Sequence, residues 1–181
     1  MFTMPELRNY LRSLQAPMPK HYELPENEYY ATPDETVQRL FSIIPINPTW
    51  SYLEPCKGLA EAIYRYMPEG SQWAELSHGV DYLETPFNHV DCIITNPPFS
   101  LTPQFLEKSL EEADVVIYLQ RLGYLASIGR REFWNEHKPT NLIVLSKRPS
   151  FAGKGTDKTD YCWYVWDPKG RLGLTDTFYF V

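Results

Sequence analysis

The sequence has no long apolar run and few cysteines. Its longest apolar stretches, such as residues 115–119, have the length of a buried strand and fall far short of the roughly 20 residues that a membrane span needs. The three cysteines, Cys56, Cys92 and Cys162, are odd in number and have no His or Cys partner at metal-ligand spacing. These absences argue against a membrane protein, a disulfide scaffold and a metal site, and they favour a reduced compartment.

The chain also lacks a secretory signal, internal repeats and low-complexity tracts. Its first residues do not show the charged-then-apolar order of an export signal, which favours a cytoplasmic protein. The 17 Lys and Arg residues against 23 Asp and Glu give a net charge of −6, and 43% of the residues are hydrophobic. A chain of 181 residues with this balance is expected to fold as one packed globular domain rather than to stay disordered.

From residue 32 onward, helical and extended patterns alternate, which predicts an α/β fold with a mostly parallel sheet. Residues 1–27 are expected to form a short helix over residues 5–14 and an extended lead-in, and residues 28–181 a single domain. Strands are expected over residues 50–55, 72–76, 90–95, 114–119 and 141–146. Helices are expected over residues 33–44, 60–67, 106–113 and 129–137. The aromatic segments 161–167 and 175–181 are expected to pair as a C-terminal antiparallel hairpin.

The most informative motif is Asn96-Pro97-Pro98-Phe99, which follows the apolar strand 90–95 directly. In open α/β sheets, ligands bind at the carboxyl ends of strands. The two prolines fix the backbone, remove two N–H donors and leave carbonyl groups to accept hydrogen bonds. The Asn96 side-chain oxygen and the Pro97 carbonyl would each accept one hydrogen from a planar amino group, while Phe99 stacks on the ring that bears it.

This motif resembles the Asp/Asn-Pro-Pro-Tyr/Phe signature of the S-adenosylmethionine-dependent adenine-N6 DNA methyltransferases, which have a Rossmann-like class I fold. Other segments resemble motifs of the same family: Tyr29-Tyr30-Ala31-Thr32-Pro33, Leu53-Glu54-Pro55-Cys56-Lys57-Gly58, Ala74-Glu75-Leu76 and Gly79-Val80-Asp81-Tyr82-Leu83. Segments 130–134, 146–151 and 161–166 look like the body of small phage-borne methyltransferases, which would place the protein in the cytoplasm of a bacterial host. The resemblance covers about residues 28 to 167 and has the gamma-type motif order.

The resemblance implies that S-adenosylmethionine is the cofactor. It places the methionine carboxylate near Tyr30 and Thr32, and the methionine ammonium near the Glu54-Pro55 corner and the turn at Gly58. A cofactor that carries a sulfonium and an ammonium group suits a pocket lined by carboxylates. Because methyl transfer needs little acid or base help, in-line positioning should supply most of the acceleration.

The resemblance also assigns two further acids. Glu75 would accept hydrogen bonds from the cofactor ribose, and Asp81 from the cofactor adenine amine, with Asn96 bordering both cofactor and substrate. The chain departs from the family at the turn Gly58-Leu59-Ala60, where Gly-x-Gly is usual. The added Cβ narrows the approach to the cofactor, so we expect weaker binding. A non-catalytic nucleic-acid-binding or partner subunit therefore remains an alternative.

Charge placement points to nucleic acid. Residues 121–158 hold eight basic and three acidic residues, a local charge of +5, whereas the remainder has 9 − 20 = −11. The expected DNA-contacting residues within this segment are Arg121, Arg130, Arg131, Lys147, Arg148, Lys154 and Lys158. The same segment would equally suit an ordinary solvated helix face. No separate target-recognition domain is visible, so a homodimer or partner protein would supply sequence recognition. RNA adenine and a protein glutamine amide are the alternative substrates.

Overall fold

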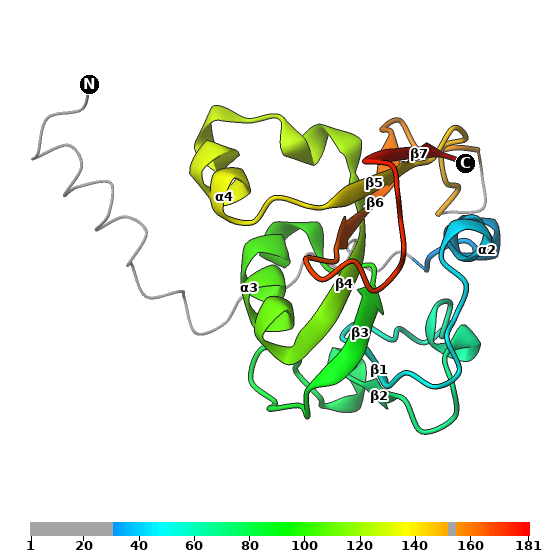
Figure 1. Ribbon diagram of the computed structural model, residues 1–181. Coiled ribbons are helices and arrows are strands. Elements are labelled where there is room, and N and C mark those ends of the chain that lie inside the picture. Colours follow the sequence, from blue (N-terminus) through cyan, green and yellow to red (C-terminus); the bar gives the residue numbers. More distant parts are fainter. Residues whose placement is uncertain (1–30, 152–154) are drawn as a thin grey trace, which may run out of the picture.

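The computed structural model describes residues 31–151 and 155–181, which build one seven-stranded sheet with helices on both faces (Figure 1). The strand order is β2-β1-β3-β4-β6-β5-β7. The strands are β1 (Tyr52–Glu54), β2 (Gln72–Trp73), β3 (Val90–Thr95), β4 (Ala113–Arg121), β5 (Asn141–Val144), β6 (Tyr161–Trp166) and β7 (Phe178–Phe180). Strands β1 to β4 are parallel, whereas β6 is antiparallel to both β4 and β5. The predicted α/β class and mostly parallel sheet are therefore confirmed.

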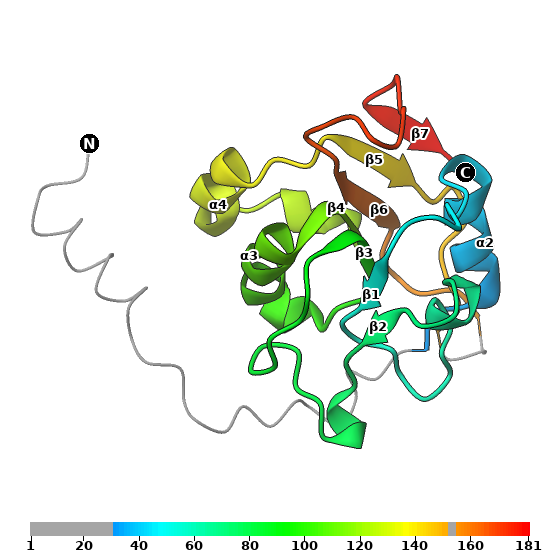
Figure 2. The ribbon, with the colours of Figure 1, turned by 60° about the horizontal axis from the view of Figure 1, so that its bottom comes forward.

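Three α-helices cover the sheet: α2 (Asp34–Ile43), α3 (Thr102–Glu112) and α4 (Arg131–Glu136). Figure 2 shows α2 on one face and α3 and α4 on the other. Helix α2 starts with two acids, Asp34 and Glu35, whose negative charges interact favourably with the positive end of the helix dipole. Helix α3 carries Pro103 in its first turn, where the missing N–H costs nothing. Within residues 31–151 and 155–181, no helix combines the length and apolar character that a membrane span requires.

The central strands are buried on both faces, which explains their near-continuous apolar sequences. In β3, Cys92 and Ile94 pack in the core that includes Val37 of α2. Ile93, between them, packs in the opposite core with Leu106 of α3. The alternation of side chains along a strand thus gives the sheet one hydrophobic core on each face.

The C-terminal segment is attached to the amino ends of β3 and β4 by Arg171. One guanidinium nitrogen lies 2.6 Å from Asp91 Oδ1, and another lies 2.7 Å from Asp114 Oδ2. The guanidinium also lies 4.4 Å from the centre of the Trp50 ring. This cluster lies at the edge of the sheet opposite the carboxyl ends of these two strands.

The helix predicted over residues 60–67 is wrong. The structure has only a 3₁₀ turn, Tyr64–Tyr66, because the preceding backbone leaves the helical path twice. Gly58 and Glu61 have positive φ angles of 64° and 48°, in the left-handed region. Two side chains of the periodic pattern, Ile63 and Met67, are still buried, in the core that includes Val37 of α2.

The C-terminal hairpin is also wrong in its pairing. Strand β5 lies between β6 and β7, and β7 is parallel to β5. All six residues of β6 are buried, so this strand needs neighbours on both sides. By contrast, Phe178 and Phe180 of β7 are 56% and 72% exposed, as expected for an edge strand.

Smaller differences concern element ends. Strand β2 ends at Trp73, and Glu75 pairs only through a single bridge with Val80. The basic stretch 129–137 begins as a 3₁₀ turn, Ile128–Arg130, before α4. The N-terminal helix expected over residues 5–14 lies outside the described residues.

Candidate active site

The strand order reverses at β1, so the carboxyl ends of β1 and β3 lie at the topological switch point of the sheet. From β1 the chain adds β2 on one side, then returns to add β3 on the other. Open α/β sheets bind ligands at such a switch point. Leu53 of β1 lies opposite Ile93 of β3, so Glu54 and Thr95 end the two strands at the same edge. The Glu54-Pro55 and Asn96-Pro97 corners therefore leave neighbouring strands in the same direction.

Glu54 is a buried carboxylate with an unused oxygen. Its residue is 2% exposed, and its Oε2 atom has no hydrogen-bond partner among the described residues. Burial raises the pKa of Glu54 well above its usual value, although the Tyr64 backbone N–H and the nearby Lys57 ammonium act in the opposite direction. A buried acceptor without a donor is costly unless a ligand completes it.

Glu75 follows β2 and is already bound by protein donors. Its Oε2 accepts from the Gly58 backbone N–H at 2.8 Å, and its Oε1 accepts from the Ser77 N–H at 3.0 Å and hydroxyl at 2.6 Å. Partial burial would raise the pKa of Glu75, but these hydrogen bonds outweigh it and leave that pKa below its usual value. Glu75 is thus a charged carboxylate that fixes the Gly58 turn.

The three acids assigned from the cofactor motifs all affect the titration of one thiol. Burial raises the pKa of Cys56, and the negative charges of Glu54, Glu75 and Asp81 raise it further, whereas the Thr95 side chain lowers it. The sequence analysis identified these acids but gave no functional role to Cys56.

Asp81 lies in the turn after the Glu75–Val80 bridge. Its Oδ1 accepts a hydrogen bond of 2.9 Å from the Leu83 backbone N–H. The bridge between Glu75 and Val80 keeps Asp81 close to the carboxyl end of β2.

The Asn96-Pro97-Pro98-Phe99 corner is held in place from two directions. The Asn96 side-chain nitrogen donates to the Thr32 hydroxyl at 3.1 Å, so the motif before α2 is joined to this corner. The Phe99 carbonyl accepts from the Thr102 hydroxyl at 3.1 Å, which in turn accepts from Gln120 at 2.7 Å. Pro97 is buried, whereas the other three residues of the motif are partly exposed.

Phe99 lies in a small group of side chains at the carboxyl end of β4. The Arg121 guanidinium carbon is 5.0 Å from the centre of the Phe99 ring, and the Tyr161 ring centre is 6.0 Å from it. Arg121 and Tyr161 are paired residues of β4 and β6. Arg121, expected to contact DNA, is therefore next to the aromatic side chain expected to stack on the base.

Three of the other basic residues have partners within the protein, although two of them, Lys147 and Arg148, are also exposed. Arg130 donates to the Tyr124 carbonyl at 2.8 Å, Lys147 pairs with Glu35 at 2.9 Å, and Arg148 pairs with Asp160 at 2.6 Å. Arg131 and Lys158 are exposed. Tyr30 and Lys154, which complete the set of expected site residues, lie outside the described residues.

The turn that departs from the family pattern is open to solvent. Leu59 is 67% exposed, and Ala60 is also exposed. The residue that replaces the second glycine therefore lies at the surface of the protein.

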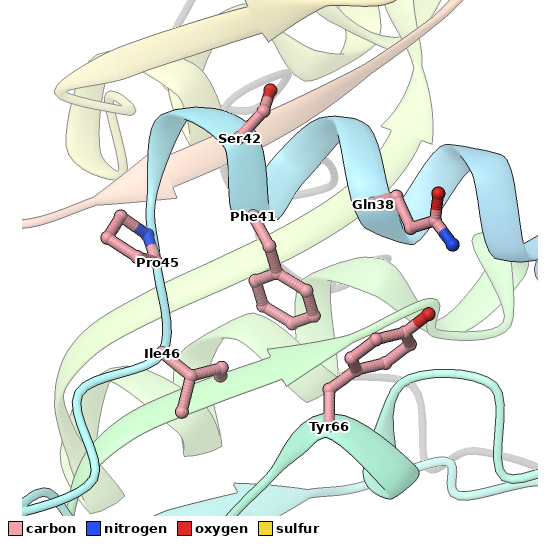
Figure 3. Close-up of a pocket in the computed structure, with 6 residues that line it drawn as sticks. All are labelled: Gln38, Phe41, Ser42, Pro45, Ile46 and Tyr66. Atoms are coloured by element: carbon pink, nitrogen blue, oxygen red, sulfur yellow. The ribbon is translucent and has the colours of Figure 1, made fainter.

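A separate groove of about 390 Å³ lies between α2 and the 3₁₀ turn after β1 (Figure 3). Its lining residues are Gln38, Phe41, Ser42, Pro45, Ile46 and Tyr66. None of them belongs to the motifs at the carboxyl edge, and the lining holds no carboxylate. The groove is therefore not part of the candidate active site.

Comparisons with known proteins agree on the fold. No protein-family model and no curated protein matches the sequence. Among solved structures, a putative class I S-adenosylmethionine-dependent methyltransferase from Listeria monocytogenes is similar, with a TM-score of 0.62, 13% identity and coverage of 99% of this chain and 74% of that one. This chain has the class I methyltransferase fold.

Two further structures with this methyltransferase fold differ in their described roles. A putative RNA methyltransferase from Pyrococcus horikoshii has a TM-score of 0.55 and 19% identity, with 90% of this chain and 98% of that one covered. A modification subunit of a putative type I restriction enzyme from Vibrio vulnificus has a TM-score of 0.53 and 18% identity, with coverages of 89% and 48%. At these identities the likeness establishes the fold alone.

Proposed function

We propose that this protein transfers a methyl group from S-adenosylmethionine to the N6 amine of adenine in DNA. The observation that carries the proposal is the buried, unpartnered Glu54 oxygen at the end of β1, on the strand that pairs with β3, which ends in the Asn-Pro-Pro-Phe corner. Acceptors for a cationic cofactor and for a substrate amine thus lie at one edge of the sheet.

The residues present fit the cofactor because Glu54 offers a buried oxygen without a partner. In the proposal this carboxylate binds the methionine ammonium, and Thr32, with Tyr30, binds the methionine carboxylate. Glu75 and Asp81 accept from the ribose and the adenine. S-adenosylmethionine supplies the electrophilic methyl group when bound.

The substrate amine is oriented by the Asn-Pro-Pro-Phe corner. Its two hydrogens are accepted by the Asn96 side-chain oxygen and the Pro97 carbonyl, which turns the nitrogen lone pair toward the methyl group. Phe99 stacks on the flipped base, an interaction worth roughly 1–3 kcal/mol. The bond between Asn96 and Thr32 supports this role, since it fixes which end of the amide faces the amine.

DNA is the favoured nucleic acid because the corner resembles the adenine-N6 signature and a modification subunit of a putative restriction enzyme shares the fold. The chain covers 48% of that subunit, which is consistent with recognition by a partner. RNA adenine is the second candidate, supported by the Pyrococcus horikoshii neighbour, which this chain covers almost entirely.

The test is to incubate the protein with isotopically labelled S-adenosylmethionine and either DNA or RNA, digest to nucleosides and identify the labelled product. The proposal expects N6-methyladenine from DNA. Asn96→Ala should lower the rate by about 10³-fold, because positioning is lost, while cofactor binding measured by calorimetry stays nearly intact. Asn135→Ala, an exposed residue of α4, is the control.

Each other outcome identifies an alternative. If only RNA is labelled, RNA adenine replaces DNA adenine as the proposed substrate. If the label appears on protein glutamine, the substrate is the glutamine side-chain amide. Absence of calorimetric heat at millimolar cofactor would favour the non-catalytic subunit.

A further inference from the structure

The candidate cofactor motif after β1 contains a largely buried cation of its own, the ammonium group of Lys57. Its side chain is 10% exposed, and its nitrogen lies 5.0 Å from the Tyr64 ring centre and 4.3 Å from the Trp73 ring centre. The same nitrogen is 2.9 Å from Glu61 Oε1. Two aromatic rings and one carboxylate therefore form a cage around this ammonium.

Lys57 lies in the same acidic environment as Glu54 but pairs with a different residue. Its positive charge is close enough to lower the pKa of Glu54, yet its ion pair is with Glu61, and Glu54 Oε2 has no partner. Glu75 is not an alternative partner, because its oxygens already accept three hydrogen bonds. Glu61 and Glu54 are thus the two acids between which Lys57 is placed.

The backbone at Glu61 shows that this arrangement is specifically maintained. Among the described residues, Glu61 is the one non-glycine residue with a positive φ, at 48°. This conformation is strained for a residue with a Cβ, and it must be offset by local contacts. The contacts present include the ion pair with Lys57, a hydrogen bond of 3.3 Å from the Glu61 N–H to the Gly58 carbonyl and one of 3.1 Å from the Arg65 N–H to the Glu61 carbonyl.

We propose that Glu61 is a positioning residue that holds the Lys57 ammonium in the cage and so keeps the Glu54 carboxylate open to the cationic end of the cofactor. The cofactor part of this inference rests on the proposed function. Without the Glu61 charge, Lys57 would turn to Glu54, whose pKa its charge already lowers, and an ion pair there would occupy the oxygen that the cofactor needs.

The test compares Glu61→Gln with the double variant Lys57→Met/Glu61→Gln. Calorimetry with S-adenosylmethionine should show about tenfold weaker binding for Glu61→Gln, equivalent to about 1.4 kcal/mol, and recovery in the double variant. A purely structural role of Glu61 would not be rescued by removing Lys57. The control is Glu112→Gln on α3, where Lys108 has the same spacing, a 2.9 Å ion pair and a ring contact at 5.2 Å.

A second measurement needs no cofactor. Carbon-13 NMR titration of the Glu54 carboxyl should show a lower pKa in Glu61→Gln, because Lys57 moves next to it, and a higher pKa in the double variant. An unchanged Glu54 titration in Glu61→Gln overturns the inference. If the titration shifts as expected but no variant binds S-adenosylmethionine, the placement of Lys57 is supported and the proposed cofactor site is overturned.

Discussion

The Asn96 side-chain nitrogen donates to the Thr32 hydroxyl across 3.1 Å, joining two motifs that are 64 residues apart in sequence. Thr32 is 7% exposed, so this bond is shielded from water. An Asn amide has two chemically different ends, and this contact holds the nitrogen end toward Thr32. The cofactor-side and substrate-side motifs are thus mechanically connected.

Thr32→Val should therefore impair catalysis at a distance from the reacting nitrogen. Loss of the hydroxyl removes the acceptor that holds the Asn96 amide nitrogen, and a misplaced acceptor oxygen costs on the order of 10²-fold in rate. Thr32→Ser keeps the hydroxyl and should stay within a few-fold of the wild type. Separate kcat and KM values would check this; equal losses in Val and Ser variants would point to packing instead.

Phe99→Ala should weaken binding of the target base, since a stack of roughly 1–3 kcal/mol corresponds to about 5- to 150-fold. Phe99→Tyr retains a ring and should retain most of the affinity. The readout is the KM for DNA alongside a direct binding measurement. Phe180→Ala, at an exposed position on β7, serves as the matched loss of a phenylalanine, and the two alanine variants behaving alike would contradict the stacking role.

Cofactor affinity should rise with pH. Burial raises the pKa of Glu54 well above its usual value, so the carboxylate that binds the ammonium forms only as the pH passes that raised pKa. Below it, the protonated acid loses the charge attraction. Calorimetry across a pH series should show this dependence in the wild type and not in Glu54→Gln, whose affinity should be low throughout.

Glu54→Gln should at the same time stabilise the fold. A carboxyl whose pKa is raised on folding costs stability once the pH exceeds its unfolded value near 4.5, and the full cost applies above its folded pKa. The neutral amide removes this cost. We expect the Tm advantage of the variant over the wild type to grow from pH 5 to pH 8, as is typical where a site is built at the expense of stability. A variant less stable than the wild type at every pH would contradict this expectation.

Arg171→Ala should destabilise the protein by about 1 kcal/mol, a partly exposed ion-pair network being worth little more than this. The Ser51 backbone N–H, followed by Arg171, lowers the pKa of Asp91 to about 2. This stabilisation is complete above the unfolded pKa near 3.8 and is lost as the pH falls through about 2. Urea denaturation of both proteins between pH 6 and pH 2 should therefore converge at the acidic end, and a constant difference would exclude Asp91 as the partner.

The parts of the fold that sequence could predict are those set by local burial. Strand β3 was predicted with its observed limits because a parallel strand buried on both faces is continuously apolar. The 60–67 segment has helical spacing too, but Glu61 adopts a left-handed conformation that its own side chain does not reveal. The partner of β6 was likewise not encoded locally, because alternation indicates a strand without indicating its neighbour.

The candidate site divides in the same way. Motif order placed Glu54 and Glu75 near strand ends and Asp81 in the turn after the second strand, and the negative charges of all three raise the pKa of Cys56. The positions of Cys56 and Lys57 depend on contacts between distant segments, so their surroundings were not predictable. Lys57 does belong to the Leu53–Gly58 motif identified in the sequence, and the presence of a basic residue between two acids was a signal that it could influence them.

Strand β6 lies between β4 and β5 in the sheet but is synthesised after both of them. Strands β4 and β5 cannot pair with each other before β6 is in place, because the six buried residues of β6 must lie between them. Closure of the sheet is therefore an insertion step with long sequence separation, which slows folding. If the chain is cut between β5 and β6, the two fragments should reassemble only if the second fragment can insert β6 between β4 and β5.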